Sequence, residues 1–254
     1  MHPTLTPATN IDEVLIQLDS IIEWAKANGS RLGYFPALYR RVTARVKDGI
    51  AAGEFEDGPR MEHLDVVFAN RYLVALRDYW AGKPTTESWR VAFEGCKRWR
   101  PLVLQHLMAG MSAHIQLDLG VSAAEVAPGN QIWGLEKDFA KINALLLSLI
   151  DQVQDDLAEN WRALKLIDWV AGRKDERLAG FGIEVTRKQA WQVALNMAQF
   201  KGEDLKTAIR NLDQRVSRFG KVMLGPRWLL MLTLSGIRIL ETGSIYKKIK
   251  ALQD

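Results

Sequence analysis

Residues 10–22, NIDEVLIQLDSII, decide the type of fold that this sequence predicts. Their apolar residues recur three and four positions apart, a spacing that places them along one face of an α-helix. Asn10 and Glu13 have the pattern of a capping box, in which two side chains satisfy free N–H groups at a helix start. Because Asn28 and Gly29 favour a helix end, we expect a helix from Ile11 to about residue 28.

The same helical spacing recurs along most of the chain. It predicts further helices near residues 36–53, 61–80, 86–96, 101–119, 132–170, 186–199, 203–219 and 226–240, with a short capped turn near 122–125. Alternating apolar and polar runs are absent, and so are the turn signals that join hairpin strands. We therefore expect an all-α protein, a single bundle-like domain of about eight to ten helices spanning residues 1–254 without a significant sheet. A subdomain boundary is expected in the polar, glycine-containing stretch 172–182.

Composition indicates an ordinary globular protein. Hydrophobic residues make up 48% of the 254 residues and charged residues 25%, which argues against disorder. The net charge of +4 is spread along the chain without a nucleic-acid-binding signature, so no nucleic-acid partner is predicted. Cys96 is the single cysteine, which excludes an internal disulfide, and no signal peptide pattern precedes the first helix. We expect a cytoplasmic protein.

The predicted helix at residues 226–240 is apolar on nearly every side. Its continuous apolar run is shorter than the roughly 20 residues that a membrane-spanning helix needs, so no transmembrane segment is predicted. A central core helix is the favoured interpretation. Peripheral membrane contact through residues 226–250, helped by the lysines at the C-terminal end, is the alternative.

Polar residues at four-residue steps mark the helix predicted at 101–119. His106, Gly110, His114 and Asp118 would lie along one stripe, with His114 and Asp118 one turn apart and able to touch. An Asp beside a histidine fixes the ring's tautomer and favours its charged form, as a general base requires. The two histidines are separated by about 12 Å of helix and cannot share a metal ion, so no metal site is predicted.

Two features of this helix call for an explanation. Asp118 would stand at the helix C-terminus, where the helix dipole disfavours a carboxylate, so another group must hold it there. Gly110 and Ser112 are small residues that would let a ligand or another helix approach the backbone. A purely structural His–Asp hydrogen bond remains the alternative interpretation of the pair.

A second polar set lies on the helix predicted at 61–80. Asp65 and Tyr72 share a face with Asn70 nearby, among apolar neighbours, and a carboxylate in such surroundings must be paired or exposed. Asp138 raises the same question near the start of the helix predicted at 132–170. A helix start favours its negative charge, so capping is a sufficient explanation.

Three stretches of the chain resemble a known family. Residues 64–72 (LDVVFANRY), 110–119 (GMSAHIQLDL) and 138–143 (DFAKIN) resemble a bacterial and fungal family called domain of unknown function 5995, over most of the chain. The phrase Ala-His-Ile-x-x-Asp-Leu at 113–119 is the most specific part, and Asn is usual in the family where Ser112 stands. The resemblance implies no activity or cofactor. It implies that five polar residues form one set: Asp65, Asn70, His114, Asp118 and Asp138.

Three hypotheses for the function remain open. The first is an enzyme acting on a small molecule, with His114 as general acid or base and Asp118 orienting it. Substrate binding would then involve Asp65, Asn70, Tyr72, His106, Ser112 and Asp138. The second is a non-catalytic protein that binds a small ligand or lipid between the aromatic walls Trp89, Trp99 and Trp133. The third is an interaction protein in which the His–Asp pair serves packing alone.

Overall fold

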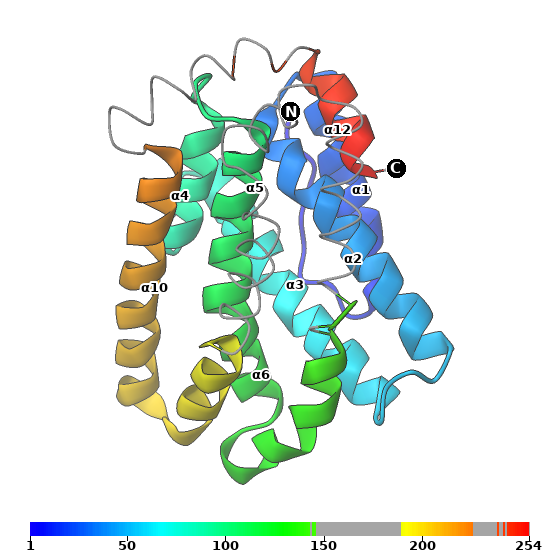
Figure 1. Ribbon diagram of the computed structural model, residues 1–254, viewed down its shortest axis with the longest axis vertical. Helices are drawn as coiled ribbons and strands as arrows, with labels where there is room; N and C mark the ends of the chain where they lie inside the picture. The colour runs from blue at the N-terminus through cyan, green and yellow to red at the C-terminus, as the bar shows by residue number, and fades with distance from the viewer. Residues whose placement is uncertain (143, 146–188, 226–237, 239–240, 242, 254) are drawn as a thin grey trace, which may run out of the picture.

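The computed structural model describes residues 1–142, 144–145, 189–225, 238, 241 and 243–253 (Figure 1). All regular structure in these residues is helical and none is strand, which confirms the predicted all-α fold. The stretch 172–182 and nearly all of the predicted helix at 226–240 lie outside the described residues. The elements are the α-helices α1 (Ile11–Ala27), α2 (Tyr34–Ala51), α3 (Gly58–Trp80), α4 (Glu87–Cys96), α5 (Val103–Met111), α6 (Gly120–Val126), α10 (Gly202–Leu224) and α12 (Ile245–Gln253), the 3₁₀ turns η1 (Arg31–Gly33) and η3 (Gly129–Leu135), and the π-helix η2 (Ser112–Leu119).

The first helix begins as its sequence predicts. The Asn10 side chain accepts a hydrogen bond from the N–H of Glu13 at 2.9 Å. The Glu13 carboxylate accepts from the N–H of Thr9 at 2.7 Å, one residue earlier than a capping box requires. The side chain of Asp57 accepts similarly from the N–H of Arg60 and begins α3.

A central helix runs without interruption from Val103 to Val126 through α5, η2 and α6. The predicted helix end at residue 119 and the separate turn near 122–125 are therefore wrong. Gly120 lies inside this helix, and a Cβ added to it would come 2.5 Å from Cγ1 of Val193. The glycine is needed because the helical residues 189–199 approach closely at this point, and it does not end the helix.

The remaining helices pack around the central helix. Figure 1 shows α4 and α10 on one side of it and α1 and α2 on the other, with α12 against α1 and α2. The predicted start of a helix at residue 132 is wrong, because the chain forms the 3₁₀ turn η3 there and becomes α-helical from residue 136. No described helix combines the length and apolarity needed to cross a membrane.

Candidate functional site

His114 lies in η2, where aromatic side chains from three helices surround it. Its ring stacks on Phe68 of α3 with 3.6 Å between ring centroids, and it meets Tyr39 of α2 edge-on at 4.4 Å. Only 3% of His114 is exposed. The rings around it, which we call the aromatic cluster, are Phe35, Tyr39, Phe68, Tyr72 and Trp89.

Asp118 lies beside His114 and is held by two other side chains. Its Oδ1 accepts from Nε of Arg71 at 2.9 Å, and its Oδ2 accepts from the indole Nε1 of Trp89 at 2.7 Å. Because the central helix continues to Val126, Asp118 is not at a helix C-terminus as predicted. Arg71 and Trp89 supply the stabilisation that its burial requires, and sequence reasoning missed both roles. The only sequence evidence that could have pointed to these partners is that Arg71 lies next to Asn70 in the stretch 64–72.

The two groups lie within the π-helix η2, four positions and about one turn apart. Nδ1 of His114 is 3.6 Å from Oδ2 of Asp118, longer than an ordinary hydrogen bond. The predicted pair therefore meets, but as charge neighbours. Single π-turns within α-helices occur frequently at functional sites.

The imidazole of His114 has an unusual environment. Neither ring nitrogen has a hydrogen-bond partner among the residues that the structure describes. Burial lowers the pKa of His114 below its ordinary 6.5, and the nearby Asp118 carboxylate opposes this only in part. The ring is therefore neutral at pH 7 and able to accept a proton.

A small cavity of about 40 Å³ borders the imidazole. Side chains of α2, α3, α5 and η2 form its wall, and apart from His114 and the ring of Tyr39 that wall is aliphatic, phenyl or thioether. A cavity of this size holds one or two waters or a small apolar group. Val42 and Met111, on the wall, are partly exposed, so the cavity lies near the surface.

Asp65 is the second buried titratable group near the aromatic cluster. It is 4% exposed, and its Oδ2 has no hydrogen-bond partner among the described residues. Burial, helped by Glu62, raises the pKa of Asp65 to about 7. Asp65 does not line the cavity. Burial raises the pKa of Tyr39, whose ring touches His114, and the charge of Asp65 adds to this effect.

The other predicted binding residues divide between the cluster and separate places. Tyr72 belongs to the aromatic cluster. Asn70 instead binds the N-terminal segment, because its side chain accepts a hydrogen bond from the N–H of Ala8 and donates one to the carbonyl of Ala8. Ser112 is buried two positions before His114, and on a helix this spacing points the two side chains to different sides. His106 borders a different cavity, beside Tyr34.

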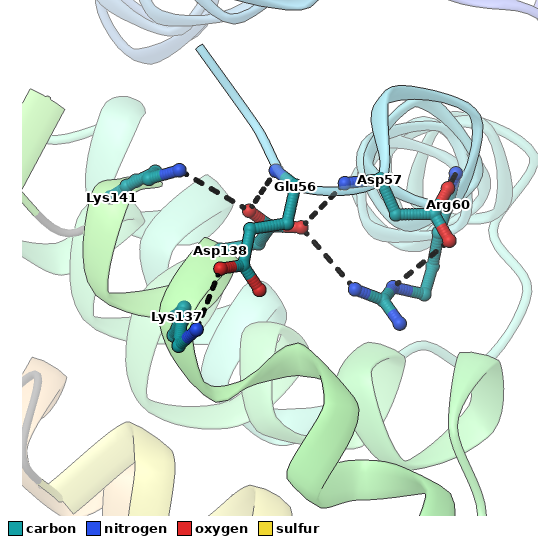
Figure 2. A network of polar contacts seen from close by, with 6 residues as sticks. All are labelled: Glu56, Asp57, Arg60, Lys137, Asp138 and Lys141. Atoms are coloured by element: carbon teal, nitrogen blue, oxygen red, sulfur yellow. Dashed lines mark hydrogen bonds and ion pairs between the residues drawn. The ribbon is translucent and has the colours of Figure 1, made fainter.

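Asp138 lies in a separate network, shown in Figure 2. Its carboxylate, which is fully buried, accepts from the N–H groups of Glu56 at 2.7 Å and Asp57 at 3.2 Å and from Arg60 at 3.3 Å. Lys141 adds an ion pair at 3.9 Å. Asp138 thus ties the segment before α3 to the helix after η3, and the five residues that the resemblance groups together occupy three places in the fold.

Replacing Asp138 with Ala is expected to lower the free energy of unfolding by about 2 kcal/mol, because two backbone N–H groups and Arg60 lose a charged acceptor. Urea denaturation followed by circular dichroism measures this. Lys137→Ala is the control, since Lys137 is an exposed residue of the same network whose ion pair with Glu56 lies at the surface. Equal losses in the two variants would show that Asp138 has no special structural role.

The structure also bears on possible metal ligands and on the tryptophans expected to line a ligand site. No group of three or more His, Cys, Asp or Glu side chains suited to a metal ion occurs in the described residues. Trp99 and Trp133 are 56% and 55% exposed and form no part of the wall of the cavity beside His114. Trp99 lies in the loop after α4, where the guanidinium of Arg238 lies over its ring at 5.4 Å, and Trp133 lies in η3, where it meets Trp191 edge-on at 6.4 Å.

Comparison with known proteins gives one match. The model of a family described as Family of unknown function (DUF5995) matches residues 11–226. No curated protein and no solved structure matches the chain. The matched range contains α1 to α10 and therefore the whole environment of His114 described above.

Proposed function

This chain belongs to DUF5995, a family of unknown function, and we propose from the geometry of the site that it is an enzyme acting on a small organic molecule. In this proposal His114 is the general acid or base, and Asp118 stabilises the imidazolium that forms when the ring takes up a proton. Asp65 and Tyr72 complete the site. Because the cavity beside the imidazole has room for only one or two water-sized groups, one small polar group of the substrate enters it and the rest of the molecule stays outside.

The observation that carries this proposal is the imidazole of His114. A histidine that serves packing alone normally has its ring nitrogens bonded to protein, because a buried polar atom without a partner is costly. Here both nitrogens lack such a partner among the described residues, and the ring borders a cavity. The surface of the cavity is apolar and both nitrogens are buried, so a polar group of a substrate in that cavity would supply the missing hydrogen bond once the imidazole turns towards it.

The protonation states support acid–base chemistry. The lowered pKa of His114 provides a neutral ring that accepts a proton, and the Asp118 carboxylate then stabilises the imidazolium. The pKa of Asp65, raised to about 7, makes its carboxyl group able to exchange a proton near neutral pH. A carboxyl shifted upward and an imidazole shifted downward in one region are typical of acid–base sites.

A screen of small organic molecules by ligand-observed NMR, with wild type and His114→Phe in parallel, tests the proposal. Phenylalanine keeps the stack on Phe68 but removes both ring nitrogens. We expect some compounds to bind wild type at least about tenfold more tightly than the variant, and one or more of these to be converted by wild type only.

The outcomes separate the hypotheses. Equal binding of the compounds to wild type and to His114→Phe would show that the nitrogens of His114 do not contact the ligand. Binding that depends on His114 without conversion of any bound compound would favour the non-catalytic ligand-binding protein. A His114 ring that titrates above pH 6.5 in ¹⁵N NMR spectra would contradict the neutral base.

A further inference from the structure

A second cluster of buried polar groups surrounds His106, away from His114. Arg31 of η1, Tyr34 of α2 and His106 of α5 border one inner cavity of about 10 Å³. Tyr34 and His106 are 1% and 4% exposed, and their ring centroids are 5.9 Å apart. Phe35 separates this cavity from the one beside His114, because its ring lines both and packs against Gly110.

Hydrogen-bonding groups in this cluster are unused. Among the described residues, Nε of Arg31, the hydroxyl of Tyr34 and both ring nitrogens of His106 have no hydrogen-bond partner. Arg31 makes one bond, from Nη1 to the carbonyl of Cys96 at 3.3 Å. Nε of Arg31 and the hydroxyl of Tyr34 are therefore donors without an acceptor among the described residues, at the border of a single cavity, whereas the imidazole of His106 lies beside the carbonyl of Pro101.

The charge around the cluster is positive. Burial, together with the charges of Arg31, Arg238 and Arg98, lowers the pKa of His106 to about 3. The nearby carboxylate of Glu241 is engaged by Arg238 at 2.8 Å and Lys248 at 3.1 Å. In the described part of the chain Arg31 has no carboxylate partner. Unused donors in a positive environment favour a negatively charged ligand.

An open cleft of about 1030 Å³ lies beside this cluster. Arg31, Phe93 and Cys96 line both the cleft and the inner cavity, so these side chains stand between the two spaces and Arg31 faces both. Trp24 and Trp80 stand on the wall of the cleft with 5.1 Å between their ring centroids. The cleft has the size of a small-molecule site, whereas the inner cavity has room for about one water-sized group.

We propose that Arg31, with the hydroxyl of Tyr34 behind it, binds the carboxylate of a small organic acid whose flat, apolar body lies in the cleft beside Trp24, Trp80 and the ring of His2 that stacks on Trp80. A carboxylate is planar, matches the guanidinium fork and presents one oxygen to a space of this size. A tetrahedral phosphate is bulkier. The inner cavity shares Phe35, Tyr72 and Trp89 with the aromatic cluster, but the proposed contacts to the carboxylate use none of them, so their test does not depend on the proposed function.

Binding of phenylacetate and of its neutral counterpart phenylacetamide to the full chain tests this site, measured by calorimetry and by tryptophan fluorescence. We expect phenylacetate to bind at least about tenfold more tightly than the amide. Arg31→Gln should weaken the binding of phenylacetate about tenfold or more. Tyr34→Phe, which keeps the ring, should weaken it by about threefold or more. Arg218→Gln removes the same charge from an exposed position of α10 outside the cleft and should change nothing.

Three results would overturn the proposal. Phenylacetate would not bind wild type at about 5 mM, the acid and the amide would bind with equal affinity, or Arg218→Gln would weaken phenylacetate binding as much as Arg31→Gln does. Inorganic phosphate that displaces phenylacetate with equal or higher affinity would replace the carboxylate by a phosphate as the ligand class. The comparison of acid with amide uses wild type alone and holds even if a variant fails to fold.

Discussion

Asp118→Ala is expected to lower the free energy of unfolding by about 3–5 kcal/mol, the usual cost of removing one partner of a buried ion pair. The carboxylate is 1% exposed and accepts from both Arg71 and Trp89. Its loss leaves the guanidinium of Arg71, itself about one quarter exposed, without its counter-charge, and the indole N–H of Trp89 without an acceptor. Urea denaturation followed by circular dichroism measures the change.

Asp19→Ala is the matched control. Asp19 also pairs with an arginine, Arg40, but 44% of its side chain is exposed, so water replaces the lost contact and a loss below about 1 kcal/mol is expected. Trp89→Phe isolates the indole hydrogen bond and should fall between the two. An Asp118→Ala loss no larger than that of Asp19→Ala would mean that the interactions of Asp118 contribute nothing to stability.

The sequence predicts the helices well where the signals are local. Asn10 identifies the start of α1 because its capping bond joins residues three positions apart. Gly120 misleads because the same residue type ends helices and permits close packing between them. Only the position of Val193, more than seventy residues later, distinguishes the two explanations.

The site is predictable only in part for a similar reason. Four-residue spacing identifies His114 and Asp118 as neighbours, since both belong to one helix. The partners of Asp118 come from α3 and α4, and no pattern within the central helix points to Arg71 or Trp89. The same spacing wrongly joins His106 to His114. A bulky ring, Phe35, occupies the space that Gly110 leaves between them.

Asp65→Asn is expected to stabilise the protein, and more strongly as the pH rises. The folded-state pKa of Asp65 is about 7, against an ordinary value of 3.8. Below about pH 4 the group is protonated in both the folded and the unfolded chain and costs nothing. Between about pH 4 and 7 the unfolded chain releases the proton and the folded protein keeps it, so wild-type stability falls as pH rises.

Above pH 7 the full cost of the buried charge is present. Because one pKa unit corresponds to about 1.4 kcal/mol, the raised pKa of Asp65 implies that wild type is about 4 kcal/mol less stable than Asp65→Asn at pH 8. Urea denaturation of both proteins at pH 4.5 and pH 8 measures this, with Asp48→Asn, an exposed position on α2, as control. If the two proteins instead kept the same difference at both pH values, the pKa of Asp65 would be the same in the folded and the unfolded protein. Asp65 would then be ionised at neutral pH and unable to donate a proton.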